Sequence, residues 1–589
     1  MALFTPSASP AVTVKEIDLT GVVPNVQTST GAFVGNFGWG PVGVATLVSD
    51  ESGLVSTFSA PTDKNTVDFH SAAYFLKYSN SLYVVREQDS DGVNAVANHS
   101  SLGSLTAQAI NNLDAFENLS IDSSDGAFIA KYPGTIGNSL KVSVVGTDSA
   151  SGSSLNFNNW AYKSEFDAAP GTSKFVSDLG GSNDEIHVVV VDEDGEISGT
   201  AGTVLEAFPF LSVAKNAKAS DGTSNYYKDV LKNRSNWIYS GGFHTGDSDS
   251  LSDFVGSNWG NNATTSGEDF KTGQNFSKTQ STWSFASGVT SSSLGTDDVL
   301  RGFDKFEDKD NIEVDFLIAP ESIADATATT VVNDLVGIAG TTRKDCVAVA
   351  SPSRNAVITV GTNAGVLACN NTYTKSSYLI QDNNYLKVFD KYNDKYIKIP
   401  ANSSTAGLMA ATDLVAAPWF SPAGSRRGRY VGITDIILSP TKAERDTLYK
   451  AGINPIANIP GEGIMLFGDK TNESRPSAFD RINVRRLFLG IERAIAIAGR
   501  NVMFEFNDEF TRAEFVNIVE PFLREIQGRR GITDFRVVCD ATNNTAAVVD
   551  RNEFIASIFI KPARSINFVT LNFVAVRTGV EFEEVVGTV

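Results

Sequence analysis

The chain has 589 residues, which is too long for one compact domain of roughly 100–200 residues, so we expect three or four domains. Hydrophobic residues make up 42% of the chain and charged residues 20%, a balance that excludes a mostly disordered protein. The net charge is -20, from 48 Lys and Arg against 68 Asp and Glu, and a surface that acidic repels phosphate. We therefore expect no nucleic-acid partner.

The three cysteines, Cys346, Cys369 and Cys539, are sparse and show no CxxC spacing. This pattern argues against a disulfide framework and indicates a reducing compartment. The first ten residues, MALFTPSASP, carry no basic stretch followed by an apolar run, so we expect no signal peptide. No window reaches the roughly 20 apolar residues of a membrane span. We expect a soluble protein made in a cytosol, with no membrane insertion.

Residues 1–22 are predicted to form an extended arm. Val12 and Val14 alternate with polar residues, and Ile17 and Leu19 do so again after a phase slip, which is the pattern of a strand. The Pro-containing break at 21–27 leaves this strand without a local hairpin partner, so it must pair at a distance. Regular structure then follows, as a strand at 31–37, a helix at 69–77 and a buried strand at 81–86.

Residues 91–300 are rich in Ser, Gly, Asn and Asp and carry short β runs, at 127–130, 140–145 and 186–191. Within them, 245–296 approaches low complexity and is predicted to be a surface loop. Order returns as a βαβ-like unit, with a strand at 312–318, a helix at 324–340 and a strand at 346–350. The sequence thus predicts a mixed α/β domain formed by 23–90 and 301–455, with a β-rich insertion at 91–300.

The last helix predicted in the mixed α/β domain begins at Ser439-Pro440, a cap followed by a first-turn proline, and ends at Gly452. Residues 456–589 are predicted to form a C-terminal domain. Its first helix follows the cap-like Ser477-x-x-Asp480 and ends at Gly499, with one apolar face made by Val484, Leu487, Phe488, Ile491, Ile495 and Ala498.

A second helix of this domain follows the capping-box match Thr511-x-x-Glu514 and ends at Gly528, with Pro521 expected to kink it or to start its final part. Strands are predicted at 535–539, 554–560 and 566–576, before an extended tail at 580–586. Of the 16 basic residues in 456–589, 14 are arginine, which suits buried and interfacial ion pairs better than lysine.

Motifs with catalytic or binding chemistry have plainer explanations. Gly38–Gly43 spells GxGxxG, but Pro41 and a following β run predict a turn rather than a dinucleotide site. Asp192-Glu-Asp-Gly195 lacks the rest of a calcium loop and is predicted to be a turn. The histidines, His70, His99, His187 and His244, have no metal-ligand spacing. We expect no catalytic residues, no metal and no cofactor.

Several segments nevertheless resemble one family when they are taken together and in order. They are Ser9–Asp18, Thr30–Pro41, Ala130–Asn138, Val191–Gly195, Ala451–Ile456, Gly468–Thr471, Asn483–Phe488 and Phe504–Asn507. Their order and the chain length resemble the tail sheath proteins of contractile-tailed bacteriophages (myoviruses). The resemblance covers most of the chain and is weakest at 245–300.

The resemblance implies an α+β multi-domain sheath subunit, with mixed α/β inner and middle domains, a β-rich outer insertion and extended N- and C-terminal arms. Such subunits form stacked hexameric rings, a homo-oligomeric helical sheath around the inner tail tube protein, bounded by baseplate and tail terminator proteins. Contraction drives the tube through the host envelope for genome ejection. The protein would belong to the virion and assemble in the host cytoplasm, as a structural protein and not an enzyme.

The resemblance also suggests site residues. It implies that the two arms make the inter-subunit strand pairing, or strand exchange. The residues concerned are Val12, Val14, Ile17, Leu19, Val580, Phe582, Val585 and Val586. The alternative is that these strands close the molecule's own sheet. Charge contacts with the tube or with neighbouring subunits are expected at Arg485, Arg486, Arg493, Arg529 and Arg530. For Arg529 and Arg530 the alternative is solvated charge favoured by the dipole of the preceding helix.

Two other functions stay open on the sequence alone. The first is the sheath of a tailocin or another contractile injection system, which the subunit sequence does not separate from a phage sheath. The second is a β-rich glycan-binding or glycan-active protein, which would be a stable monomer with a concave site of carboxylates or aromatic rings.

Overall fold

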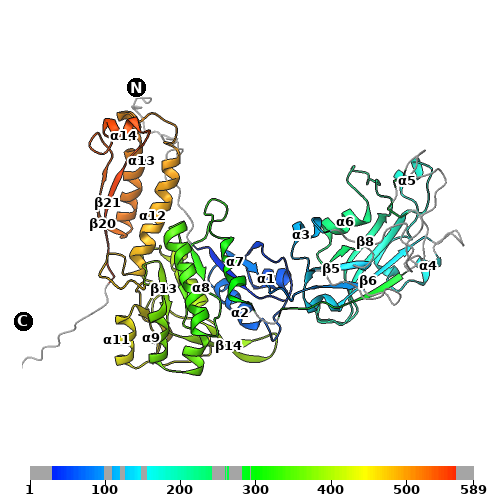
Figure 1. Ribbon diagram of the computed structural model, residues 1–589, viewed down its shortest axis with the longest axis horizontal. Coiled ribbons are helices and arrows are strands. Elements are labelled where there is room, and N and C mark those ends of the chain that lie inside the picture. Colours follow the sequence, from blue (N-terminus) through cyan, green and yellow to red (C-terminus); the bar gives the residue numbers. More distant parts are fainter. Residues whose placement is uncertain are drawn as a thin grey trace, which may run out of the picture. The chain divides into compact units, whose positions relative to one another are not determined.

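The computed structural model describes residues 29–97, 109–119, 126–147, 155–241, 259–260, 262–263, 281–291 and 294–565. The chain has the mixed α/β fold that the sequence predicts and divides into two compact units. The larger unit comprises Gln27–Ala417 and Pro422–Ile482, and the C-terminal unit comprises Pro418–Ser421 and the chain from Asn483 onward. Figure 1 shows the elements of both units.

The larger unit is built on a seven-stranded sheet that joins segments far apart in sequence. Its strands, in spatial order, are β17 (Ile453–Asn454), β13 (Leu379–Asp382), β12 (Val347–Ala350), β11 (Phe316–Ile318), β1 (Gly31–Gly35), β3 (Leu82–Arg86) and β2 (Ala45–Val48). All pairs are parallel except that of β2 with β3. Parallel strands need crossover connections, and the helices supply them.

The helices around this sheet are α1 (Glu51–Phe58), α2 (Thr66–Leu76), α7 (Thr296–Asp304), α8 (Asp325–Gly337), α9 (Asn363–Thr372), α10 (Asn402–Val415) and α11 (Lys442–Lys450). Alternate residues of β1 reach opposite faces. Ala32 and Val34 join a buried cluster with Phe303 of α7 and Leu335 of α8. On the other face the ring of Phe75 in α2 packs edge-on against that of Phe316. Both faces are therefore covered, as parallel sheets require.

A second seven-stranded sheet lies between β3 and β11 in the chain. Its order is β8 (Thr203–Ser212), β7 (Glu185–Asp192), β6 (Leu140–Gly146), β10 (Ser281–Ala286), β4 (Asn94–Ala97), β5 (Phe128–Pro133) and β9 (Ile238–Ser240), and every pair is antiparallel. Short helices accompany it: α3 (Leu113–Glu117), α4 (Leu155–Asn159), α5 (Lys174–Asp178) and α6 (Tyr227–Arg234).

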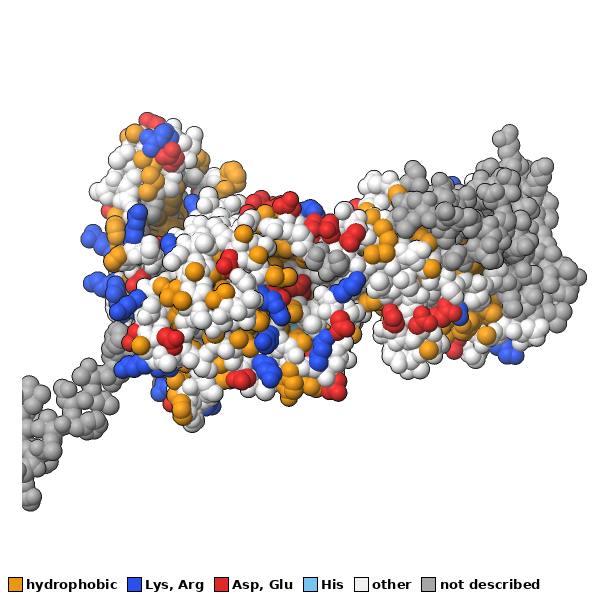
Figure 2. Space-filling model, turned by 60° about the horizontal axis from the view of Figure 1, so that its bottom comes forward, with side chains coloured by type: hydrophobic (Ala, Val, Ile, Leu, Met, Phe, Trp, Pro, Cys, Tyr) orange, Lys and Arg blue, Asp and Glu red, His pale blue; other side chains and the backbone are white. Residues whose placement is uncertain are grey.

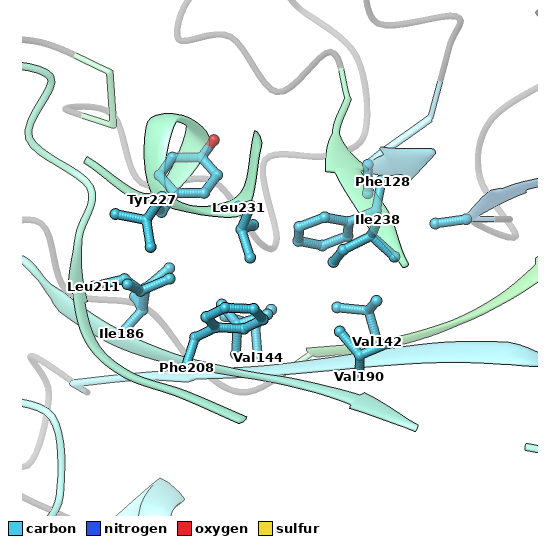
Figure 3. Close-up of a cluster of buried hydrophobic side chains, with 14 of the residues drawn as sticks. Phe128, Val142, Val144, Ile186, Val190, Phe208, Leu211, Tyr227, Leu231 and Ile238 are labelled. Atoms are coloured by element: carbon cyan, nitrogen blue, oxygen red, sulfur yellow. The ribbon is translucent and has the colours of Figure 1, made fainter. Parts of the chain in front are cut away.

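One buried cluster stabilises this second sheet. Figure 3 shows side chains from the strands, such as Val142, Val190 and Phe208, facing Tyr227 and Leu231 of α6. The strand β10 also contributes, with Trp283 and Phe285 buried at alternate positions. The prediction of a surface loop over 245–296 was therefore wrong for 281–286, because polar residues around this alternation hide a strand at the centre of the sheet.

A buried guanidinium lies where the two sheets meet. Arg86, the last residue of β3, is fully buried and donates hydrogen bonds to the main-chain oxygens of Gly40 (2.7 Å) and Pro133 (2.6 Å). Burial lowers the pKa of Arg86 to about 9. Gly134 next to it has φ +145°, and a Cβ there would lie 2.7 Å from the Gly38 oxygen. Both features hold the end of β5 tightly against the loop after β1.

The small sheets complete the larger unit. They are β15 (Lys395–Pro400), β14 (Tyr385–Asp390) and β16 (Asp435–Ile436), and the hairpin of β18 (Ile456–Ile459) and β19 (Gly463–Leu466). Ile456 and Leu466 of the hairpin share a buried cluster with Leu386 and Ile399. Residues 456–482 therefore pack with the larger unit, whereas the sequence placed the start of the C-terminal domain at 456.

The C-terminal unit has two long helices and a hairpin, α12 (Ile482–Arg500), α13 (Glu509–Gly528), β20 (Ile532–Val538) and β21 (Ser557–Pro562), with the short α14 (Ala546–Asp550) between the strands. Figure 1 shows α12 and α13 side by side along the hairpin. Leu487 and Ile491 of α12 meet Val519 and Leu523 of α13 in one buried cluster. The predicted apolar face of α12 is confirmed as the face that packs.

For three helices the structure differs from the prediction in which residue lies at the N-cap. Thr441, not Ser439, caps α11 and forms a capping box with Glu444. Asp508 caps α13 by accepting from Thr511 N at 2.8 Å, so Thr511 lies inside the helix. Asp is a stronger N-cap than Thr, which explains the shift. Ser477 accepts a hydrogen bond from Phe479 N instead of capping α12, which begins at Ile482.

Gly407 in α10 marks a close helix contact and supports a first prediction. A Cβ at Gly407 would lie 2.8 Å from Cγ of Tyr78, whose hydroxyl is held by Val431 N at 2.7 Å. We expect Gly407→Ala to lower the free energy of unfolding by about 1–3 kcal/mol, because Tyr78 would have to shift and strain its hydrogen bond with Val431 N. Urea denaturation measures this.

Gly337, the last residue of α8, is the matched control, since no atom of the described residues would come within 4 Å of its Cβ. Gly337→Ala should leave stability unchanged or raise it by up to about 1 kcal/mol, the helix propensity difference. Equal effects of the two substitutions would contradict the packing explanation for Gly407.

Candidate assembly site

The two histidines that the structure describes in the larger unit, His70 and His187, are buried and paired within the protein. The His70 ring pairs with Asp390 at 3.1 Å with both side chains buried, and His187 bonds the main-chain oxygen of Ala168 at 2.9 Å. His99 and His244 lie outside the described residues. No group of three or more His, Cys, Asp or Glu suited to a metal occurs in the part of the chain that the structure describes.

The two sequence motifs that mimic ligand sites are turns, as predicted. Gly38–Gly43 leads from β1 into the strand β2, with positive φ at Gly40 and Gly43. Asp192 uses its carboxylate to accept from the main-chain nitrogens of Gly195, Ile197 and Ser198 at 2.7–3.0 Å. Burial would raise the pKa of Asp192, but hydrogen bonds from the Ser139 hydroxyl and then from Ser198 and Ile197 outweigh it and lower the pKa. The carboxylate thus closes its own turn.

Asp382, at the end of β13, is the most perturbed carboxyl that the central sheet carries. It is fully buried, and it accepts hydrogen bonds from Ser351 Oγ at 2.9 Å and Thr405 Oγ1 at 3.2 Å. Burial outweighs these bonds and raises its pKa to about 7. Because no catalytic partner surrounds it among the described residues, we interpret this carboxyl as structural.

The raised pKa of Asp382 predicts how stability depends on pH. The folded protein holds this proton up to about pH 7, whereas the unfolded chain releases it near pH 4. The folded state therefore binds more protons between those values, and stability falls as pH rises through them. We expect the unfolding temperature to drop less between pH 5 and pH 8 in Asp382→Asn than in the wild type. Parallel pH profiles would contradict this.

The residues predicted for inter-subunit strand pairing lie outside the described residues, as does the predicted strand at 566–576. They are Val12, Val14, Ile17, Leu19, Val580, Phe582, Val585 and Val586. The hairpin that precedes the C-terminal arm is described. In it β20 pairs antiparallel with β21, with Arg536 opposite Phe559, and within the described residues neither strand has a second neighbour. Such edges are suited to strand addition.

The five predicted arginines differ in exposure. Arg485 and Arg486 of α12 are buried, Arg493 is half-buried, and Arg529 and Arg530 after α13 are exposed. The Arg529 guanidinium lies 5.1 Å from the Trp419 ring centre, and the indole Nε1 donates to Arg529 O at 3.1 Å. Arg530 takes the left-handed conformation with φ +67°. Their role in charge contacts stays a prediction.

Sequence reasoning missed an apolar surface between α12 and α13. Met503, Phe504, Phe506 and Phe510 are exposed, with Phe504 fully so and at φ +70°. The loop is fixed by Asn507, whose side chain donates to Glu553 O at 2.7 Å and accepts from Arg512 Nε at 2.7 Å. Clustered exposed aromatic side chains are typical of protein interfaces. The sequence feature that could have predicted this surface is the presence of three phenylalanines within seven residues, 504–510.

No helix among the described residues is long and apolar enough to cross a membrane. The C-terminal unit thus has strand edges, exposed arginines and exposed aromatic rings that suit assembly. Comparison with known proteins shows the family. The model of the phage tail sheath protein central domain matches residues 293–472, and that of the phage tail sheath C-terminal domain matches 474–575. The tail sheath protein of Vibrio phage KVP40 is 31% identical, over 98% of this chain and 99% of that protein.

This chain belongs to the phage tail sheath protein family. The tail sheath protein of Enterobacteria phage T4 is also 31% identical, over 98% of this chain and 99% of its own length. Among solved structures, the sheath tail protein of Listeria innocua has the same fold, with a TM-score of 0.52 at 12% identity over 91% of this chain and 96% of that one. The protein is thus a contractile tail sheath protein, a structural component of the virion and not an enzyme.

Proposed function

We propose that this sheath protein polymerises as stacked hexameric rings around an inner tail tube, and that contraction of the lattice drives the tube through the host cell envelope. The observation that carries the proposal is the match to phage tail sheath proteins over nearly the whole chain. Because these full-length relatives are phage proteins, they favour a phage tail over a tailocin or another injection system. The partners would be the tube protein, the baseplate and the tail terminator.

The proposed division of labour follows the chain. Residues 1–22 would form an arm that joins the inner domain, 23–90 and 301–455 the middle domain, and 91–300 the outer insertion. Residues 456–482 pack with the middle domain, so the inner domain with its own terminal arm would be formed by 483–589. The open edges of β20 and β21 support the inner assignment, since strands from neighbouring copies could add there. Main-chain hydrogen bonds of this kind would tether subunits while the rest of each body moves.

The source of work would be the lattice itself. An extended sheath would be metastable, with a barrier between two packings of the same subunit and a gain of contact on contraction. Arg493, Arg529 and Arg530 would contribute charge pairs to the tube or to neighbouring subunits, whereas Arg485 and Arg486 are buried within the subunit. Each subunit need gain only a few kcal/mol, because every copy in the tail contributes.

Negative-stain electron microscopy of the purified protein tests the proposal. We expect long hollow cylinders of the wild-type protein at high concentration. A protein that stays monomeric under all assembly conditions would contradict the proposal, and sugar binding by such a monomer would favour the glycan-active alternative.

A further inference from the structure

A short loop of the larger unit concentrates positive charge in an otherwise acidic protein. We call residues 425–429, Ser-Arg-Arg-Gly-Arg, the arginine loop. Arg426 and Arg429 are exposed and Arg427 is half-buried. Burial and the neighbouring charge of Arg426 both lower the pKa of Arg427. The loop therefore holds like charges close together.

The main chain holds the arginine loop in a fixed shape. Gly428 N donates to Gly424 O at 2.7 Å, and Leu466 N donates to Gly428 O at 2.8 Å, which docks the loop on the hairpin of β18 and β19. A Cβ at Gly428 would lie 2.7 Å from the Gly424 nitrogen, so the turn needs glycine. A rigid loop loses little conformational entropy when it binds a partner.

Two of the three arginines of the arginine loop, Arg426 and Arg429, have no carboxylate partner among the described residues. Arg426 makes no ion pair within the described part of the chain. Arg429 uses its guanidinium for a main-chain oxygen, that of Glu462, with Nε at 2.7 Å. The exposed carboxylate of Glu462 itself is not within ion-pair distance. The loop thus presents guanidinium groups that suit an acidic partner.

An acidic surface of matching character lies elsewhere on the same unit. We call residues 304–313 the acidic segment; it carries the exposed acids Asp304, Glu307, Asp308, Asp310 and Glu313 against Lys305 and Lys309. Among the described residues, Asp304 and Glu307 make no ion pair. Their charges, after burial, help to raise the pKa of the neighbouring Asp334. Asp304 and Glu307 therefore carry charge that no ion pair with a described residue compensates.

The acidic segment is also rigid. Arg343 donates to Phe306 O at 2.6 Å and to Ile312 O at 2.9 Å, and so fixes both ends of the intervening stretch. Figure 2 shows several groups of acidic and of basic side chains on the visible face of the protein, some of them next to each other. Two preformed surfaces of opposite charge are therefore present on one chain.

The two surfaces lie toward opposite ends of the strands of the central sheet. The acidic segment leads into the start of β11, and Arg343 precedes the start of β12. The arginine loop leads into Tyr430, whose hydroxyl bonds Thr405, and Thr405 reaches Asp382 at the end of β13. Because β11, β12 and β13 are parallel, one surface lies by their amino ends and the other by their carboxyl ends. They are placed to meet between copies.

We propose that the arginine loop of one copy docks on the acidic segment of another copy of this chain, in a head-to-tail contact that repeats along the assembly. The inference rests on the proposed polymerisation and names one contact within it. Heterologous contacts of this kind generate rings or helical filaments. Docking relieves the repulsion that each surface carries in the isolated subunit.

The test compares charge-reversal variants by pelleting and negative-stain microscopy at physiological salt. We expect Arg426→Glu to raise the protein concentration needed for assembly about tenfold or more, since like charges replace an attractive pair. Glu307→Arg should have a similar effect. Arg475→Glu, at an exposed site outside both surfaces, should assemble as the wild type does. Unchanged thermal unfolding of each monomer establishes that the variants fold.

The deciding measurement is an equimolar mixture of Arg426→Glu and Glu307→Arg. In alternating copies every contact regains opposite charges, so we expect assembly to return to near the wild-type concentration. Normal assembly by Arg426→Glu alone would overturn the proposal, and so would a mixture that fails to assemble, which would point to another acidic partner for the loop. Failure of the wild type to polymerise would instead contradict the proposed function.

Discussion

Deletion of residues 1–20 is expected to abolish assembly into cylinders and to leave the monomer folded. The reason is that the arm is predicted to pair with a neighbouring subunit through main-chain hydrogen bonds, each worth about 0.5–1.5 kcal/mol, and through apolar side chains. Losing several such contacts per subunit should raise the concentration for assembly by far more than tenfold. Pelleting with negative-stain microscopy measures assembly, and thermal unfolding measures the monomer.

A pair of substitution variants makes this test residue-specific. Ser at the four apolar positions of the arm, Val12, Val14, Ile17 and Leu19, should reproduce the deletion. Ala at the alternate positions Thr13, Lys15 and Asp18 should leave assembly intact, because these side chains would face away from the partner. Unchanged assembly after deletion, or a deletion that unfolds the monomer, would show that the strand closes the subunit's own structure.

The second large effect is expected at Arg343. Its side chain is fully buried and donates to Asp345 at 2.9 and 3.1 Å, besides its bonds to the main-chain oxygens of Phe306 and Ile312. Arg343→Ala removes these donors and leaves buried oxygens without partners. We expect a loss of about 3–5 kcal/mol in the free energy of unfolding, measured by urea denaturation.

Lys174→Ala is the control for Arg343. Its ammonium pairs with Asp178 at 2.8 Å, but both side chains are mostly exposed, at 87% and 63%. Exposed pairs of this kind contribute little, so the free energy of unfolding should change by no more than about 0.5 kcal/mol. Equal losses in the two variants would contradict the view that burial makes Arg343 important.

The elements with strong apolar patterns were predictable. Leu82–Arg86, Val347–Ala350 and Asp325–Gly337 form a strand, a strand and a helix close to where the sequence placed them. In each case the apolar pattern points the same way as the packing against the central sheet. Helix ends were less predictable, because several Ser, Thr and Asp residues near each start compete as caps, and the choice at Asp508 depends on local geometry.

The candidate site was only partly predictable. The run of arginines in the arginine loop is visible in the sequence. Only the fold shows that no described carboxylate pairs with Arg426, which is what makes the loop a candidate contact. The exposure of Phe504 could not be foreseen, because its left-handed conformation and its projection from the turn depend on contacts made by Asn507 with residues far along the chain. Burial of Arg485 and Arg486 likewise follows from packing and not from helical spacing.

The strand order of the central sheet has a consequence for synthesis on the ribosome. Gly31 of β1 pairs with Phe316 of β11, which follows 285 positions later. At about 5–20 residues per second, β1 waits roughly 15–60 s before that partner emerges. Throughout this interval β1 has only β3 as a partner, so the nascent chain exposes the apolar edge of β1 that β11 later covers, which is the kind of segment that chaperones bind. We therefore expect that yield of soluble protein in a bacterial host depends on chaperone supply and on growth temperature more than on the stability of the finished subunit.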